Sequence, residues 1–182
     1  MNPKGSKCIL GQAKNFRGKS KGALCKMKEG LDPLDIGTLL HGILFAYQKT
    51  TKDTLGTGAA IFVHPVLNII KGISKRSGVS LIKGSNIDEV FENLSRVMPT
   101  TGLVKSFGLE KLSCNTYILH VDECAWATHI HSELKPRDVT CPYALVAMSI
   151  FEEVLGCRVK VADSEYTENG CRTRIEPLLE SK

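Results

Sequence analysis

The spacing of hydrophobic positions along the chain changes near Pro99. Over residues 35–55 and 59–75, apolar side chains recur every three or four positions, which predicts two amphipathic helices separated by a Gly-Thr-Gly break. A third helix is predicted to begin after Asn86, a residue that favours helix N-caps, and to end at Pro99. The first half of the chain is therefore predicted to be helical.

Beyond Pro99 the apolar positions alternate, as they do in strands. Strands are predicted at 103–107 and 117–121, with the turn between them at 108–111 or at 113–115. A short helix over 124–134 and a loop at 135–137 follow. A long helix then opens at Pro142 and stops at Gly156, before a closing hairpin of residues 158–162 and 172–175. This order predicts an α+β domain with N-terminal helices packed on a mainly antiparallel sheet and a long helix between the strand pairs.

Charge is distributed unevenly along the 182 residues. Residues 1–28 contain eight of the 24 Lys and Arg residues and no Asp or Glu, so the rest of the chain has 16 basic and 19 acidic residues. We therefore predict a flexible basic arm at 1–30 and a single domain at 31–182. Such an arm can contact nucleic acid or an anionic surface through phosphates, and the alternative is a solubilising tail.

No apolar stretch is long enough to predict a transmembrane segment, and the N-terminus has no signal-type apolar region. We therefore expect a cytoplasmic protein. Seven cysteines without a secretion signal predict free thiols or metal ligands rather than a disulfide framework.

Candidate metal chemistry is concentrated between residues 124 and 171. Thiol and imidazole groups of this density suit Zn²⁺ and related ions. Cys141 is the strongest single candidate, because a helix N-terminus lowers the pKa of a thiol. Inert packing is the equal alternative for Cys141 and Cys171, since free cysteine is often buried. The run contains Cys124, His129, His131, Cys141 and Cys171.

Catalytic motifs are absent from the sequence. It has no nucleophile elbow, no phosphate-binding glycine loop and no dinucleotide fingerprint. We therefore expect neither a nucleotide cofactor nor catalysis.

The order of motifs in the second half is similar to that of a known family. Asp138-x-x-Cys141-Pro142-x-Ala144 is followed by a helix ending Glu-x-x-Gly156, a strand, a glycine turn and Cys171 at the start of the last strand. This pattern resembles the 4-vinyl reductase domain over residues 100–177. Archaeal members of that family are labelled hydrocarbon-binding proteins. A more distant resemblance is to Bet3-like subunits of the transport protein particle.

The resemblance implies a homodimer with an apolar cavity for a small hydrophobic, aromatic or lipid-like ligand. It also implies a structural zinc held by three cysteines and a carboxylate. In this sequence Cys141, Cys171 and Asp163 match three of those positions, and Tyr166 stands at the fourth. Completing the site would need a further ligand, which the sequence offers at Cys124, His129 or His131.

We therefore predict a non-catalytic module in which the helices at 35–55, 59–75 and 142–155 enclose a ligand pocket. One alternative is a zinc-binding regulator whose basic arm contacts nucleic acid. Another is an assembly subunit related to the transport-particle proteins. The predicted pocket residues are Leu40, Leu44, Tyr47, Phe62, Trp126, Leu145, Met148 and Phe151.

Overall fold

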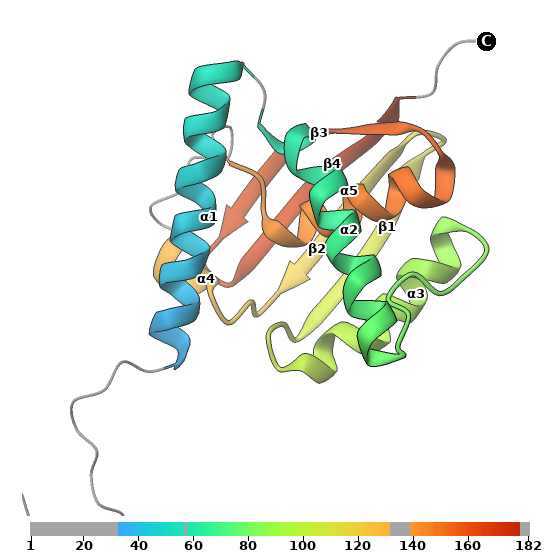
Figure 1. The fold of residues 1–182 in the computed structure, drawn as a ribbon, viewed down its shortest axis with the longest axis horizontal. Helices are drawn as coiled ribbons and strands as arrows, with labels where there is room; N and C mark the ends of the chain where they lie inside the picture. The colour runs from blue at the N-terminus through green and yellow to red at the C-terminus, as the bar shows by residue number, and fades with distance from the viewer. Residues whose placement is uncertain (1–32, 57, 132–138, 179–182) are drawn as a thin grey trace, which may run out of the picture. The chain divides into compact units, whose positions relative to one another are not determined.

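The computed structural model describes residues 33–56, 58–131 and 139–178. Helices and strands follow in the predicted order, which confirms the α+β class (Figure 1). The elements are α1 (Pro33–Leu55), α2 (Ala59–Ser77), α3 (Ile87–Val97), a 3₁₀ turn (Met98–Thr101), β1 (Ser106–Ser113), β2 (Thr116–Asp122), α4 (Ala127–Ile130), α5 (Pro142–Leu155), β3 (Arg158–Thr167) and β4 (Gly170–Leu178). The arm predicted at 1–30 lies outside the described residues. None of the described helices is both long and apolar enough to cross a membrane.

The strands form one antiparallel sheet in the order β1-β2-β4-β3. One face is apolar and buried, and the other carries charged side chains, as expected for a sheet with one solvated face. A β-bulge between Val161 and Asp163 changes the alternation of β3, so that Ser164 and Tyr166 continue the inner side begun by Val159 and Val161. The edges of the sheet are β1 and β3.

Helix α5 lies on the inner face of the sheet, and α2 packs on α5 (Figure 1). Pro142 occupies the first turn of α5, and Gly156 ends the helix in the left-handed conformation with φ 65°. The Ser149 hydroxyl of α5 donates to the Val63 carbonyl of α2 at 2.8 Å. This arrangement makes α5 the centre of the core, with Leu145, Ile150 and Phe151 at most 2% exposed.

The first predicted strand is misplaced by a few residues. Residues 103–107 were expected to form it, but β1 runs from Ser106 to Ser113, and the turn is at 114–115. After Phe107 the side chains of β1 are half-buried or exposed, since this edge strand extends past the core. Its second half therefore carries no apolar alternation that a sequence pattern could reveal.

Candidate functional site

Helix α1 turns a polar and aromatic stripe toward the domain. This inward stripe holds Thr38, His41, Phe45, Gln48 and Lys52, which are spaced by three or four residues and are all buried or half-buried. Most of the described apolar positions that predicted the helix face outward instead. Exposed among them are Leu39, Leu40, Ile43 and Tyr47, each at least 43% accessible.

Beneath the first half of this stripe lies a group of rings that we name the aromatic–histidine cluster. The His41 ring lies edge-on to Phe45 at 4.4 Å and 5.1 Å from Trp126, measured between centroids. Trp126 stacks on Tyr143 at 6.1 Å. The cluster comprises His41, Phe45, Trp126, His131, Tyr143 and Tyr166, and His131 joins it through a 5.0 Å contact with Tyr166.

The cluster also gathers polar atoms without partners. Among the described residues, four buried side-chain atoms have no nitrogen or oxygen partner: His41 Nε2, His131 Nε2, the Tyr143 hydroxyl, which instead interacts with the Cys124 thiol, and the Thr38 hydroxyl. The first three belong to the cluster, and Thr38 lies one turn before His41 on the inward stripe. Unpartnered buried groups of this kind are rare in proteins and cost about 1–3 kcal/mol each. Their concentration under one helix marks a site with unused hydrogen-bonding capacity.

Burial sets the charge state of the His41 imidazole. Loss of solvent, helped by the neighbouring His131, lowers the pKa of His41 to about 4. His131 Nδ1 lies 3.0 Å from the Thr167 carbonyl oxygen, so this nitrogen carries the proton and Nε2 is a lone-pair acceptor in the neutral ring. At neutral pH His41 is therefore uncharged, and its ring lies beside hydroxyl groups that can donate or accept a hydrogen bond.

A side-chain clamp ties the middle of α1 to the start of α5. Gln48 Nε2 donates to the Thr140 carbonyl at 3.0 Å, and the Thr140 N–H donates to Gln48 Oε1 at 2.9 Å. The Tyr166 hydroxyl donates to the adjacent Val139 carbonyl at 3.0 Å. The segment before α5 is thus held from both α1 and β3.

Three of the cysteines predicted as candidate metal ligands lie close together, next to Tyr143 and Tyr166 of the aromatic–histidine cluster. Cys124, Cys141 and Cys171 are at most 5% exposed and interact electrostatically, and we name them the thiol cluster. A hydrogen bond from Cys171 lowers the pKa of Cys141, assisted by backbone N–H groups at the start of α5, although burial opposes this. The same bond, followed by burial, raises the pKa of Cys171. These thiols are free and shielded from solvent.

The other predicted zinc ligands are dispersed. Asp163 is exposed at the bulge of β3, where one carboxylate oxygen accepts the Ser164 N–H at 3.0 Å. His131 uses one ring nitrogen on Thr167, and the side chain of His129 lies outside the described residues. Within the described part of the chain, no group of three His, Cys, Asp or Glu side chains could hold a metal ion. Zinc binding stays a prediction.

The eight predicted pocket residues occupy four different settings. Leu40 and Tyr47 are exposed, and Leu44 and Phe62 are half-buried. Trp126 belongs to the aromatic–histidine cluster. The other three, Leu145, Met148 and Phe151, are fully buried on α5.

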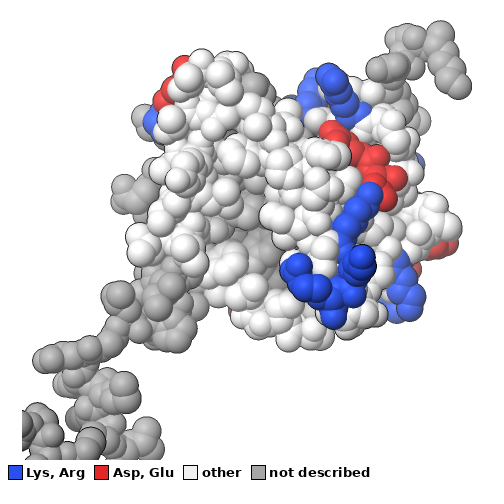
Figure 2. Space-filling view, viewed as in Figure 1, with Lys and Arg blue, Asp and Glu red and all other residues white. Residues whose placement is uncertain are grey.

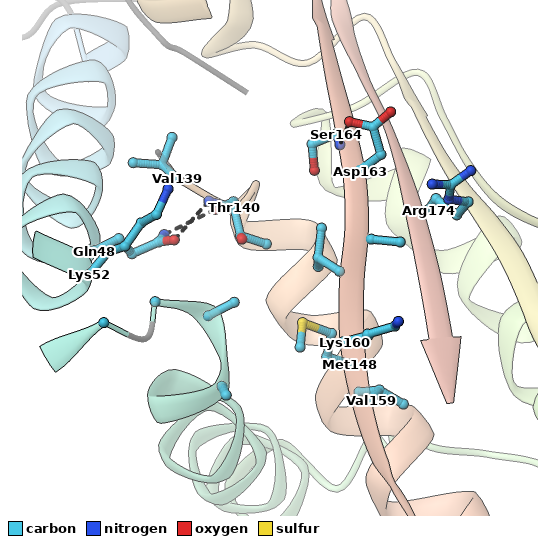
Figure 3. A pocket seen from close by; sticks show the side chains of 16 residues that line it. Gln48, Lys52, Val139, Thr140, Met148, Val159, Lys160, Asp163, Ser164 and Arg174 are labelled. Atoms are coloured by element: carbon cyan, nitrogen blue, oxygen red, sulfur yellow. Dashed lines mark hydrogen bonds between the residues drawn. The ribbon is translucent and has the colours of Figure 1, made fainter. Parts of the chain in front are cut away.

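A pocket of about 640 Å³ lies next to the clamp, between α1, the start of α2 and β3 (Figure 3), and we name it the β3 groove. Of the predicted site residues, Met148 and Asp163 line it. Its full lining is Gln48, Lys52, Gly56, Gly58, Ala59, Ala60, Val139, Thr140, Met148, Val159, Lys160, Val161, Ala162, Asp163, Ser164 and Arg174.

Sequence reasoning missed most of the polar members of these sites. The predicted pocket and metal residues do not include His41, Phe45, Gln48, Tyr143 or Tyr166. The available signal was the spacing of Thr38, His41, Phe45 and Gln48, which marks a second helical stripe opposite the apolar one.

Comparisons with known proteins give little beyond this geometry. No protein-family model matches the chain, and a search of curated proteins finds no match. Among solved structures, the chain is similar to a trafficking protein particle complex subunit 3 from Naegleria fowleri, covalently bound to palmitic acid. The two chains are 14% identical with a TM-score of 0.45, over 80% of this chain and 95% of the other. At that level of similarity the ligand and assembly of the other protein do not transfer, and the 4-vinyl reductase resemblance stays a prediction.

Proposed function

We propose that this protein is a non-catalytic module that binds a small aromatic molecule carrying a hydroxyl group, held by the aromatic–histidine cluster beneath α1. The observation that carries the proposal is the concentration of unpartnered buried atoms there, at His41, His131 and Thr38. A ligand hydroxyl can donate to an imidazole Nε2 and accept from a protein hydroxyl, which satisfies two of these groups at once.

The walls of the cluster select for an aromatic body. Phe45 and Tyr143 are at most 5% exposed, and Trp126 and Tyr166 are half-buried beside them. Aromatic rings prefer offset-stacked or edge-on neighbours, and binding sites combine such walls with a few polar groups. His41 is neutral at physiological pH and no cluster member is an acid or a permanent cation. A neutral ligand is therefore favoured over a charged one.

Access to the cluster requires α1 to move. Among the described helices and strands, α1 has its most extensive contacts with the short helix α4, and the clamp from Gln48 to Thr140 is its buried polar attachment to the α5 side. A helix attached in this way can act as a lid, because its displacement breaks few contacts. Since α1 supplies His41 and Phe45, lid closure would complete the ligand's surroundings.

The test is calorimetric titration with phenol and p-cresol, with toluene as the analogue that lacks the hydroxyl and benzoate as the charged one. A site built around a hydroxyl rejects the analogue without it. We expect at least tenfold tighter binding of the phenols than of toluene or benzoate. His41→Phe should weaken phenol binding at least tenfold.

The matched control is His64→Phe, which makes the same change at an exposed position of α2 and should leave binding unaltered. Equal affinity for phenol and toluene, or undiminished phenol binding by His41→Phe, would refute the proposal.

A second candidate function is assembly, proposed from the outward faces of α1 and α2. Figure 2 shows a broad uncharged surface on this side of the molecule. Contiguous exposed apolar surface commonly marks a protein interface. The residues involved are Leu39, Leu40, Ile43 and Tyr47 of α1 and Ile61, Ile69 and Ile73 of α2, each at least 40% exposed.

We propose that these faces form a homodimer. Light scattering coupled to size exclusion should give twice the chain mass of 19.9 kDa for the wild type. Leu40→Glu or Ile69→Glu should give monomers, whereas Leu112→Glu, an equally drastic change at an exposed position of β1, should not. A wild-type protein that stays monomeric at 100 micromolar would remove this candidate.

A further inference from the structure

The β3 groove follows the edge of a strand. Its lining includes six consecutive residues, from Val159 to Ser164 (Figure 3). Successive side chains of a strand point to opposite faces of the sheet, so a pocket on one face would be lined by alternate residues. An unbroken run means that the groove lies against the strand's backbone edge and reaches around it to both faces.

That edge has no strand partner. In the described part of the chain, β3 pairs with β4 on one side only. No loop of the described residues makes a backbone hydrogen bond to β3 on its other side. The outward N–H and C=O groups of an edge strand are a template for one further strand.

The opposite wall limits what can enter. It is built from Gln48 and Lys52 of α1, and from Gly58, Ala59 and Ala60 at the start of α2. Small residues along this wall leave space beside the strand, and the two helices bound that space on the side facing away from β3. The groove therefore suits a single extended segment between a strand edge and a helix, a recurring mode of peptide recognition.

The two sides of the groove differ in chemistry, and this difference specifies the occupant. Toward the core it presents Val159, Val161 and Met148. On the solvent side it presents Lys160 and Arg174, which share the carboxylate of Glu176 at 2.9 and 3.6 Å. The lining has three cationic side chains and the carboxylate of Asp163, and with the adjacent carboxylate of Glu176 the cationic groups outnumber the acidic ones by three to two. In an added strand, alternate side chains would meet the apolar side and the cationic side in turn.

We propose that the β3 groove binds an extended segment of a partner protein whose residues alternate between apolar and acidic, by adding it as a strand to β3. Its length is about six residues, because the lining run of β3 is six residues long. At about 3.3 Å per residue, such a segment spans about 20 Å. The bulge after Val161 twists the edge and restricts pairing to a short strand. This site is separate from the ligand cluster proposed above.

The probe is a fluorescein-labelled peptide of sequence Asp-Val-Glu-Ile-Asp-Val-Glu, with binding measured by fluorescence anisotropy. We expect saturable binding that weakens at least tenfold for a peptide of the same composition in scrambled order, and for one with alternate backbone nitrogens methylated. Hydrogen exchange at the amides of residues 159–161 should slow on binding.

Two pairs of protein variants locate the site. Ala60→Trp fills the groove wall at an exposed position and should abolish binding, whereas Asn68→Trp, exposed on the same helix outside the lining, should not. Lys160→Glu should weaken binding at least tenfold, whereas Lys75→Glu, exposed on α2 outside the lining, should not. Neither groove variant should alter phenol binding.

Several outcomes would overturn the proposal. Equal binding of the scrambled peptide would show that the net charge of the peptide, rather than its alternating pattern, accounts for binding. Full binding by Ala60→Trp, or unchanged exchange at residues 159–161, would place the peptide elsewhere. Self-association of the wild type that Ala60→Trp abolishes would assign the edge to a second copy of the chain, and absence of any peptide binding would reject the site.

Discussion

Replacing Gln48 by Leu should detach the middle of α1 at a measurable cost. The substitution keeps the side chain's approximate size and removes both hydrogen bonds to Thr140, at 2.9 and 3.0 Å. Each bond contributes about 1 kcal/mol net, and each backbone group left unpaired costs about 1–3 kcal/mol more when buried. Gln48 is 1% and Thr140 7% exposed, but the adjoining β3 groove lets water reach the backbone after the change. We therefore expect a loss of about 3 kcal/mol in the free energy of unfolding.

Urea unfolding followed by far-ultraviolet circular dichroism measures this loss, because the midpoint falls while the slope stays constant. Thr50→Ala, at an exposed position of α1, is the matched control and should change stability by no more than about 0.5 kcal/mol. A loss below about 1 kcal/mol for Gln48→Leu would show that the clamp does not hold α1, and would refute the reasoning.

Gln48→Glu gives the same clamp a pH dependence. A carboxylate can accept the Thr140 N–H but repels the Thr140 carbonyl, whereas a protonated carboxyl can donate to it. The folded pKa of the introduced carboxyl should therefore lie above the unfolded value of about 4.3. A carboxyl whose pKa is higher in the folded state than in the unfolded state stabilises the fold at pH values below its unfolded-state pKa. This stabilisation is lost as the pH rises through the folded-state pKa. The free energy of unfolding of the variant should be closer to that of the wild type at pH 4 than at pH 7. The opposite trend would contradict the hydrogen-bond geometry of the clamp.

Three further predictions concern other parts of the domain. The pKa of His41, lowered to about 4, should make stability fall as the pH drops from 6.5 toward 4, by up to about 3 kcal/mol; His41→Phe should flatten this slope in urea titrations. A Cβ at Gly170 would lie 2.0 Å from a backbone oxygen of β2, so Gly170→Ala should lower stability by about 3 kcal/mol or more, whereas Gly108→Ala, with open space around it, should lower the melting temperature little. Of the five cysteines in the described residues, exposed Cys114 should react first with a thiol reagent, and the thiol cluster only after unfolding, as peptide mapping can show.

The fold was largely predictable because its strongest signals are local. Pro142 and Gly156 bracket α5, and Asn86 caps α3 by accepting the Glu89 N–H at 2.9 Å. These features depend on a few neighbouring residues, which a single sequence displays. The bulge after Val161 and the late start of β1 depend on pairing with distant strands, so the local pattern carried no trace of them.

The candidate site was predicted less well because apolar periodicity indicates the wrong face of α1 as the buried one. The structure buries His41 and Gln48 and exposes Leu40 and Tyr47. A chain on its own cannot distinguish an apolar stripe that faces its core from one that faces another molecule, since both have the same period. The resemblance matched Cys141 and Cys171 and left Cys124 as one of three possible further ligands, so it predicted the thiol cluster only in part. The contacts of these cysteines join segments up to 47 positions apart, which periodicity cannot reveal.

The position of β4 has a consequence for synthesis of the protein. It follows β3 in the sequence, yet it lies between β2 and β3 in the sheet. While the ribosome still holds residues 171–175, the β2 edge that will receive them stays open and β3 has no strand to pair with. The sheet therefore closes only after β4 has emerged. Premature termination before Gly170 would leave the β1–β2 hairpin and an unpaired β3 with open edges, a form that quality control would have to remove.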